Sequence, residues 1–173
     1  QWNLKVVVGK QATATNIFMG ILSMVVFSPF WNIPSSIIIN ELIPKIKRNK
    51  NYLSQNNMEI LKNGKRVSGS SIQWSNYKKS FPYTIRQKPG KNNALGQVKF
   101  VFPNHFNIYL HDTPAKELFN QTTRAFSHGC IRLSEPQKLA KYLLRFEEFY
   151  TENKINELMY SEKETIVQIK PQI

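Results

Sequence analysis

The single cysteine of this 173-residue chain, together with the residues around it, constrains the fold more than any other feature. Cys130 closes the tetrad Ser127-His128-Gly129-Cys130, and a strand-like run upstream ends at His111. A thiol becomes a strong nucleophile when a neutral imidazole takes its proton or lowers its pKa. A nucleophilic Cys130 therefore requires an imidazole within reach of its thiol, and His111 and His128 are the two candidates in the nearby sequence.

The glycine before the cysteine favours a catalytic interpretation of the tetrad. Because Gly129 has no Cβ, the backbone there can approach a substrate and direct its N–H groups toward a developing oxyanion. The N–H groups of Gly129 and Cys130 are therefore the expected donors. Ser127 would either hydrogen-bond within the loop or contact substrate. The alternative interpretation of Cys130 is a small buried hydrophobic residue, as most free cysteines are.

Composition is that of an ordinary globular domain. Hydrophobic residues make up 41% of the chain and aromatic residues 12%, and the length suffices for one domain with a core. A lone cysteine excludes an internal disulfide, and the histidines do not have zinc-ligand spacing, so we expect no metal and no cofactor.

The apolar runs are too short for a membrane span. The longest, residues 17–27, is interrupted by Gly20 and Ser23, whereas a spanning helix needs about twenty residues. We therefore expect no transmembrane segment. The chain opens almost directly on a strand and without a signal peptide, which suggests a piece of a longer precursor whose targeting segment lies upstream.

The positive charge is concentrated in one segment. Residues 41–91 hold twelve Lys/Arg against two Glu, a net charge of +10 out of +13 for the whole chain. Such a segment can bind a polyanion. The patterns of nucleic-acid-binding proteins are missing, so we expect no nucleic acid partner. Either a solvated face or contact with an anionic cell-wall or membrane surface would explain the charge.

Periodicity predicts a mainly β chain with peripheral helices. The predicted strands are residues 5–8, 22–27, 97–102, 107–111 and 165–170, with shorter ones at 59–61 and 71–74. A helix is predicted over residues 35–47, where Pro44 suggests either a break or two short helices. Further helices are predicted over residues 135–149, with Ser134 as cap and Pro136 in the first turn, and over residues 154–160. Pro103-Asn104 is expected to form a hairpin turn. Residues 41–93 are polar, and we expect them to supply few residues for a core.

The stretch His111 to Leu133, HDTPAKELFNQTTRAFSHGCIRL, resembles the catalytic signature of the L,D-transpeptidases of YkuD type. Members of that family carry a histidine followed by a Ser/Thr-His-Gly-Cys tetrad. In this chain fifteen residues lie between His111 and Ser127, the first residue of the tetrad. Four flanking segments also resemble the long-form periplasmic branch of that family. They are FSPFWNIPSSI (Phe27 to Ile37), YTIRQKPGKNNALGQVKFVFPN (Tyr83 to Asn104), FNIYLHDTP (Phe106 to Pro114) and EPQKLAKYLL (Glu135 to Leu144).

The resemblance implies a fold and a location. Residues 1–173 would form one catalytic domain with a β-sandwich or barrel-like core and peripheral helices. Residues 41–93 would form an inserted α/β subdomain that caps the substrate groove. The family implies the periplasm or cell envelope of a bacterium, and we expect a monomer.

The resemblance also implies roles for the residues of the catalytic centre. Cys130 is the nucleophile and His111 the general base. Asp112 would orient His111 through its carbonyl or its carboxylate; the family favours the carbonyl, and the sequence cannot choose. His128 is the alternative base and is assigned to substrate positioning.

Further residues are assigned to substrate binding. Arg132 stands where many family members carry asparagine, and it is either a surface charge or a ligand for a substrate carboxylate. Trp31 either packs in the core or lines the groove. Tyr109, within the run that ends at His111, is placed with Ser127 among the substrate contacts.

The implied function is peptidoglycan L,D-transpeptidation, in cell-wall biogenesis and the maintenance of cell shape. The Cys130 thiolate would attack a tetrapeptide stem, release D-alanine and pass the acyl group to a diaminopimelate amine of a neighbouring stem. Donor and acceptor stems are the expected partners, and carbapenem-type β-lactams the expected acylating inhibitors.

Alternatives remain open from the sequence. With water or a protein lysine as acceptor, the same fold would be an L,D-carboxypeptidase or a protein-anchoring transferase. A sortase-like transpeptidase also orders histidine, cysteine and arginine, but the short gap and the His-Gly pair argue against it. A non-catalytic wall-binding module would keep the fold and lack a reactive thiol.

Overall fold

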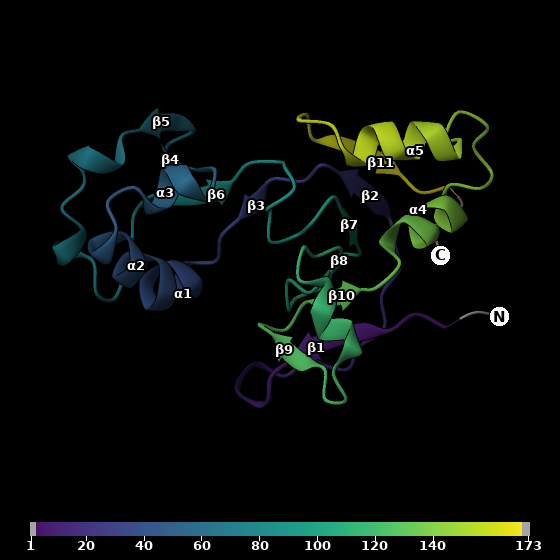
Figure 1. Cartoon of the computed structure of the whole chain (residues 1–173), viewed down its shortest axis with the longest axis horizontal. Coiled ribbons are helices and arrows are strands. Elements are labelled where there is room, and N and C mark those ends of the chain that lie inside the picture. Colours follow the sequence, from purple (N-terminus) through teal and green to yellow (C-terminus); the bar gives the residue numbers. More distant parts are fainter. Residues whose placement is uncertain (1–2, 171–173) are drawn as a thin grey trace. The chain divides into compact units, whose positions relative to one another are not determined.

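The computed structural model describes residues 3–170 and divides the chain into two compact units (Figure 1). Unit 1 consists of the chain up to Pro29 and from Pro89 onward, and unit 2 of residues Phe30–Lys88. The chain is mainly β with some helices, as the sequence predicted. Within residues 3–170, no helix combines the length and apolar character needed to cross a membrane.

Unit 1 contains a seven-stranded sheet in the order β11-β2-β7-β8-β10-β1-β9. Its strands are β1 (Val6–Gly9), β2 (Met24–Phe27), β7 (Val98–Val101), β8 (Leu110–His111), β9 (Ala125–Ser127), β10 (Ile131–Leu133) and β11 (Thr165–Gln168). Most neighbours are antiparallel, but β10 runs parallel to β8 and β9 parallel to β1. The short 3-10 helices η1 (Gln11–Thr13) and η5 (Lys116–Asn120) lie in the connections.

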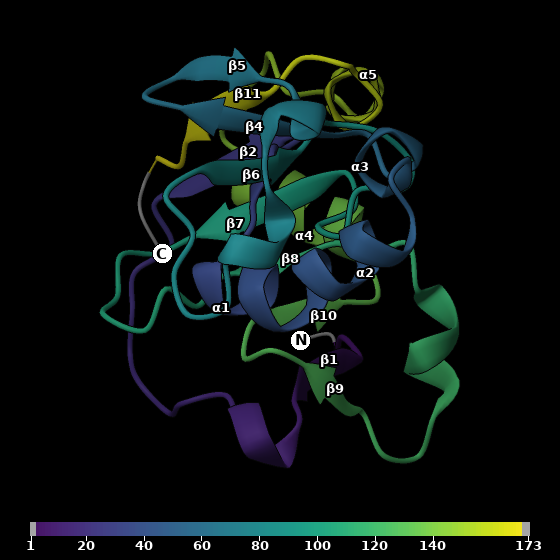
Figure 2. The same ribbon diagram turned by 90° about the vertical axis from the view of Figure 1, so that its left-hand side faces the viewer.

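The core of unit 1 lies between this sheet and two helices, α4 (Pro136–Leu143) and α5 (Glu152–Met159). Val25 pairs with Phe100 and Phe27 with Val98 across β2 and β7, and alternation places all four on one face. All four are fully buried. The packed helices contribute apolar residues to the same cluster, and α5 lies beside β11 (Figures 1 and 2).

Unit 2 contains a four-stranded antiparallel sheet in the order β3-β6-β4-β5. Its strands are β3 (Trp31–Asn32), β4 (Met58–Lys62), β5 (Lys65–Val67) and β6 (Thr84–Gln87). Asn63 and Gly64 join β4 to β5 with φ angles of 50° and 77°, as an Asn-Gly hairpin turn requires. The helical elements are α1 (Ser35–Ile37), η2 (Ile38–Leu42), α2 (Ile43–Arg48), α3 (Tyr52–Gln55), η3 (Gly69–Ser71) and η4 (Trp74–Asn76).

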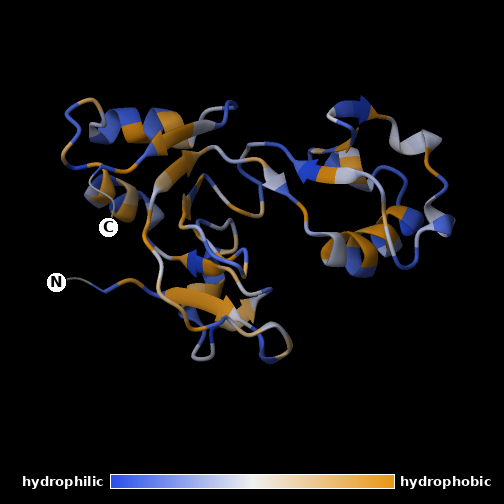
Figure 3. Cartoon of the chain, turned by 180° about the vertical axis from the view of Figure 1, so that it is seen from behind, coloured by the Kyte–Doolittle hydropathy of each residue, from blue (hydrophilic) through white to orange (hydrophobic). Residues whose placement is uncertain are grey.

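Unit 2 has a hydrophobic core of its own, contrary to the expectation from its polar composition. Figure 3 shows hydrophobic positions among hydrophilic ones along its helices and strands. The expectation was wrong because the buried apolar residues stand one or two at a time along the helices, strands and loops, and they come together only in the fold. Helical residues such as Ile38, Leu42 and Ile46 pack with Ile60 and Ile85. Part of this core comes from residues before the start of the predicted insertion, since the unit begins at residue 30.

The segment at residues 35–48 consists of two short α-helices, α1 and α2, joined by η2, with no break at Pro44. Pro44 stands in the first turn of α2, directly after η2, a π-helical turn. A proline removes a backbone donor and crowds the carbonyl four residues earlier, and the wider turn accommodates this without an interruption.

The predictions for residues 71–74 and for Pro103-Asn104 were wrong. Residues 71–74, predicted as a strand, lie in and between η3 and η4, where the Trp74 indole donates to the Gly69 carbonyl. Pro103-Asn104 is not a tight hairpin, because residues 102–109 form a longer loop between β7 and β8. The Asn104 side chain organises it: its oxygen accepts the N–H groups of Phe106 and Ile108, and its amide donates to the carbonyl of Ile108.

The helix predicted over residues 135–149 is shorter than expected and ends as α4 at Leu143. Pro136 stands in its first turn, as predicted. The predicted cap was wrong: Glu135, not Ser134, occupies the N-cap position, and its side chain makes no capping hydrogen bond. The final helix α5 begins two residues earlier than predicted, with the Thr151 hydroxyl accepting from the Lys154 N–H.

Candidate active site

The parallel pair β8 and β10 brings the predicted nucleophile and base to neighbouring strands. Arg132 stands opposite His111 in the register, and the Ile131 N–H donates to the Tyr109 carbonyl at 3.1 Å. Because side chains alternate along a strand, Cys130 and Arg132 share a face with Tyr109 and His111. Four of the predicted residues therefore come from two short strands and the residues just before them.

His111 is buried, with 5% of its surface exposed, and its Nδ1 hydrogen-bonds to the backbone carbonyl of Asp112. With the proton on Nδ1, the Nε2 lone pair is available to accept a proton. Burial, opposed by the hydrogen bond to that carbonyl, lowers the pKa of His111 to about 4. The imidazole is therefore neutral near pH 7, as a general base must be.

The Asp112 carboxylate is engaged elsewhere. Its Oδ2 accepts the Gln97 N–H at 2.9 Å, and its Oδ1 forms an ion pair with the ammonium of Lys116. Gly96 has a φ of 62°, and a Cβ there would stand 2.3 Å from Asp112 Oδ2. The sequence left open whether the carbonyl or the carboxylate of Asp112 contacts His111, and in the structure the carbonyl makes this contact.

Cys130 is partly exposed, and its thiol lies 3.8 Å from the Asn107 carbonyl oxygen. Burial raises the pKa of the thiol, while hydrogen bonding to Tyr109 and the charge of Arg132 lower it. With the pKa raised overall, the resting pair is a neutral thiol and a neutral imidazole. Reaction then requires proton transfer to a base, because the thiol is not already ionised.

Ser127 acts within the loop of the tetrad. Its hydroxyl is buried, donates to the Cys130 carbonyl at 2.6 Å and accepts the Gly129 N–H at 3.1 Å. Of the two interpretations of Ser127, the structure contains the hydrogen bonds within the loop. Since the Gly129 N–H is occupied by that hydroxyl, Cys130 supplies the more available of the two expected oxyanion donors.

The two remaining polar candidates of unit 1 differ in exposure. His128 is exposed and directly follows β9. Arg132 is half-buried, and its Nε is buried without a hydrogen-bond partner among residues 3–170. Burial lowers the pKa of Arg132, and Glu117 and Cys130 act in the opposite direction. An unsatisfied guanidinium N–H beside the thiol has the chemistry to bind a carboxylate.

Trp31 lies in unit 2, whereas the other eight predicted residues lie in unit 1. It begins β3 and packs, half-buried, against the core of unit 2. The sequence left open whether Trp31 packs in a core or lines a groove. In the structure it packs against a core.

Sequence reasoning missed two sets of supporting residues. Gln97 and Lys116 contact the Asp112 carboxylate, and Gly96 leaves room for it because it has no Cβ. Thr13 and Thr15 donate to the carbonyls of Ser127 and Gly129 from 114 residues away. No sequence pattern around these residues predicted their roles, because the contacts form only when the folded chain brings distant segments together.

Unit 2 contains a cavity of about 660 Å³ whose wall combines apolar and charged residues. The buried Glu59 carboxylate lies there, 2.7 Å from Arg66 Nε and 2.6 Å from an Arg86 nitrogen. The apolar side includes Leu53 and Trp74. No group of three or more His, Cys, Asp or Glu in the described part of the chain is placed to hold a metal ion.

Comparison with known proteins gives two matches. A family model described as the L,D-transpeptidase catalytic domain matches residues 1–169. A Haemophilus influenzae Rd protein named "Putative L,D-transpeptidase" is 41% identical over 167 residues. That alignment covers 96% of this chain and 34% of the relative, so the chain spans about a third of the relative's length.

Proposed function

Because the chain belongs to the L,D-transpeptidase catalytic-domain family, we propose that it cross-links peptidoglycan through a thioester on Cys130. The observation that carries the proposal is the pairing of β8 with β10. The buried, neutral His111 stands opposite Arg132 there, and strand alternation gives Cys130, two residues before Arg132, the same face. The substrates are a donor tetrapeptide stem and an acceptor stem of the bacterial cell wall.

In the first half-reaction, the thiol sulfur attacks the carbonyl that precedes the terminal D-alanine of the donor stem. His111 Nε2 takes the thiol proton as the S–C bond forms, and the Asp112 carbonyl stabilises the resulting imidazolium through Nδ1–H. When the C–N bond breaks, the imidazolium returns the proton to the leaving amine, and D-alanine departs.

The tetrahedral intermediate carries an oxyanion that the Cys130 N–H is proposed to bind. Removing a donor of this kind typically costs about 3 kcal/mol in the transition state. His128, exposed directly after β9, is proposed to position substrate, and Tyr109 is proposed to contact substrate beside the thiol.

Arg132 is proposed to bind a carboxylate of the stem. Its position opposite His111 and its unsatisfied buried Nε support this role. A guanidinium pairs with a carboxylate through two parallel N–H···O bonds, so it also orients the peptide.

In the second half-reaction, an amine of a diaminopimelate residue on a neighbouring stem attacks the thioester, with His111 again accepting and returning a proton. The product is a cross-link between two diaminopimelate residues. The family name favours transfer to an amine over hydrolysis or transfer to a protein lysine, which are the alternative outcomes of the same thioester. The cell envelope is the corresponding location, and the catalytic form is a monomer.

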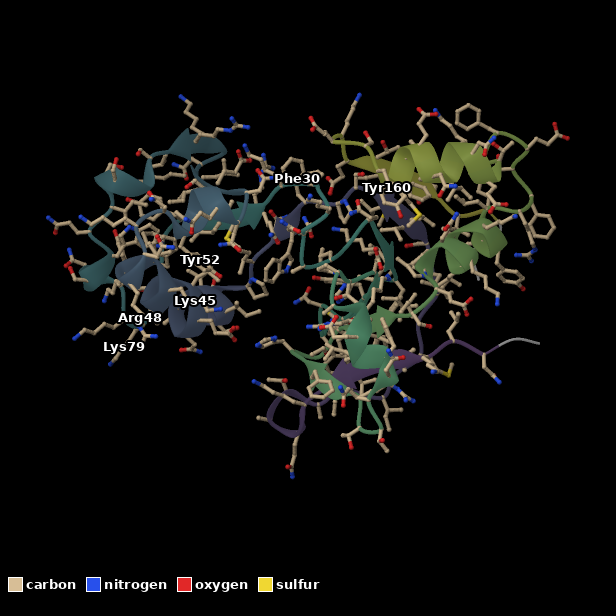
Figure 4. All side chains as sticks on the ribbon, in the orientation of Figure 1. Phe30, Lys45, Arg48, Tyr52, Lys79 and Tyr160 are labelled. Carbon is tan, nitrogen blue, oxygen red and sulfur yellow. The ribbon has the colours of Figure 1, made fainter. Side chains whose placement is uncertain are left out.

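Unit 2 is proposed to be an inserted substrate-capturing cap. Eleven Lys/Arg against Glu41 and Glu59 give residues 30–88 a net charge of +9, which favours the anionic wall polymer. Lys45, Arg48 and Lys79 project from one side of unit 2 in Figure 4. The mixed apolar and charged cavity next to Glu59 offers a further place for an amphipathic segment of that polymer.

Mass spectrometry of the intact protein tests the proposal. After incubation with a tetrapeptide stem or a carbapenem, we expect one covalent adduct, mapped to Cys130, and none in Cys130→Ala. An adduct on a serine, or turnover that survives in Cys130→Ala, would contradict the thiol mechanism. A folded protein that forms no adduct with either compound would instead be a non-catalytic wall-binding module.

A further inference from the structure

Two threonines that lie far from the tetrad in sequence hold its backbone carbonyls. The Thr15 hydroxyl donates to the Gly129 carbonyl at 2.8 Å, and the Thr13 hydroxyl donates to the Ser127 carbonyl at 3.1 Å. Both follow β1, whose Gly9 pairs with Ser127 of β9. The segment after β1 therefore lies directly against the loop that carries the thiol.

The Thr15 hydroxyl bridges two backbones. Besides donating to the Gly129 carbonyl, its oxygen accepts the Gly9 N–H at 2.9 Å. Gly9 leaves no room for adjustment, because a Cβ there would stand 2.1 Å from the Thr13 carbonyl oxygen and 2.9 Å from the Thr15 nitrogen. The hydroxyl is thus anchored to a tightly packed turn at the end of a sheet strand.

The two carbonyls depend on their threonines to different degrees. The Ser127 carbonyl also accepts the Lys10 N–H at 3.1 Å, so it keeps one donor without Thr13. For the Gly129 carbonyl, Thr15 is the sole hydrogen-bond donor within residues 3–170. Losing the Thr15 hydroxyl therefore releases the Gly129 carbonyl, whereas losing that of Thr13 does not release the carbonyl of Ser127.

Orientation of the Gly129 carbonyl matters because the peptide unit is planar. The Gly129 C=O and the Cys130 N–H belong to one peptide plane and point in opposite directions, so fixing the carbonyl fixes the N–H. Gly129 has a φ of 116°, a region that glycine enters readily, and it has no side chain to restrict rotation of that plane. An external tether is needed to keep the N–H in one direction.

We propose that Thr15 is a positioning residue for acylation: through the Gly129 carbonyl it aims the Cys130 N–H at the oxyanion of the tetrahedral intermediate. The proposal rests on the thioester chemistry proposed above. Thr15 itself neither contacts substrate nor transfers a proton.

Two reactions of the same thiol separate this role from a merely structural one. Acylation by a carbapenem passes through a tetrahedral oxyanion, whereas alkylation by iodoacetamide is a direct displacement at carbon that forms none. A change in the direction of the Cys130 N–H lowers the rate of acylation and leaves the rate of alkylation unchanged. A distorted loop or an altered thiol pKa changes both rates.

The test compares Thr15→Val, which keeps the shape and removes the hydroxyl, with Thr15→Ser, which restores it. We expect Thr15→Val to acylate about tenfold to a hundredfold more slowly, as for a weakened oxyanion donor, and to be alkylated at the wild-type rate. Thr15→Ser should recover most of the acylation rate. Thr13→Val, the matched control, should lose less than Thr15→Val.

Several outcomes would overturn the proposal. They are equal losses in acylation and alkylation, no loss in either, no recovery in Thr15→Ser, or a larger loss in Thr13→Val. If Thr15→Val does not fold, the same ratio of rates is measured for Thr15→Ala against Thr15→Ser. A wild-type protein that is alkylated but never acylated would refute the proposed function, whereas normal acylation in Thr15→Val would refute only this assignment.

Discussion

The Nδ1 atom of His111 hydrogen-bonds to the backbone carbonyl oxygen of Asp112, the next residue in the chain. A backbone carbonyl does not titrate, so it favours the Nδ1–H tautomer throughout the pH range in which the imidazole is neutral. The carboxylate of the same residue instead accepts the Gln97 N–H and pairs with Lys116. Orientation of the imidazole and attachment of its strand thus rest on two different groups of one residue.

An Asp112→Asn variant separates these two roles. It keeps the carbonyl, and its amide oxygen can still accept from Gln97, so we expect the acylation rate to stay within about threefold because the base keeps its orientation. The free energy of unfolding should fall by roughly 1 kcal/mol, because the ion pair with the half-exposed Lys116 is lost. Stopped-flow acylation and denaturant unfolding measure the two effects. A hundredfold loss of rate would show that the carboxylate acts on the imidazole.

The lowered pKa of His111 predicts a pH dependence of stability. The folded-state pKa is about 4, against about 6.5 for an unperturbed histidine, so between these values the unfolded chain binds the proton that the folded chain does not. The contribution is complete above pH 6.5 and is lost as the pH falls toward 4, by up to about 3 kcal/mol. Unfolding should be measured at several pH values for the wild type and for His111→Gln.

The difference between the two proteins isolates this histidine from the carboxylates that titrate in the same range. We expect the wild type to lose stability relative to His111→Gln as the pH falls from 6.5 to 4. Parallel curves would mean that His111 titrates normally in the folded protein and is not held neutral by burial.

The basic side chains of unit 2 are predicted to capture the wall polymer and to leave the chemistry unchanged. Neutralising Lys45, Arg48 and Lys79 together with glutamine should weaken binding to isolated sacculi at low salt and reduce its salt dependence. The rate of Cys130 alkylation should not change. Co-sedimentation with sacculi at several salt concentrations measures the binding.

A triple variant in unit 1, with Lys5, Lys163 and Lys170 changed to glutamine, removes the same charge from exposed positions and is the matched control. If both triple variants bind alike, net charge alone governs association. If neither differs from the wild type, the basic residues of unit 2 are only a solvated face.

The parts of the fold that were predicted from sequence are those with local, strong patterns. The β-branched runs of β1, β2 and β11 and the alternation of β7 indicated strands whatever their partners. By contrast, β6 was missed because Ile85 is its one buried apolar residue. Its neighbour Arg86 is held by cross-strand pairing with Glu59, which no local pattern reveals.

The residues of the candidate site also differ in whether a local sequence pattern indicates them. Cys130 and His111 could be selected from sequence because each belongs to a short continuous motif, the tetrad at residues 127–130 and the strand-like run that ends at residue 111. The partner of the Ser127 hydroxyl could not be selected in this way, because that hydroxyl could equally have faced substrate. Thr15 could not be predicted from the sequence, because its hydrogen bond to the Gly129 carbonyl joins residues 114 positions apart. Neither segment has a pattern that indicates this contact.

The measurement that tests the account most directly is the rate of Cys130 acylation in two histidine variants of confirmed fold. If His111 is the general base, His111→Ala should acylate at least about a hundredfold more slowly than the wild type, and His128→Ala should lose less. Both rates come from stopped-flow mixing with a carbapenem. A larger loss in His128→Ala, or acylation at the wild-type rate in His111→Ala, would contradict the assignment of the base.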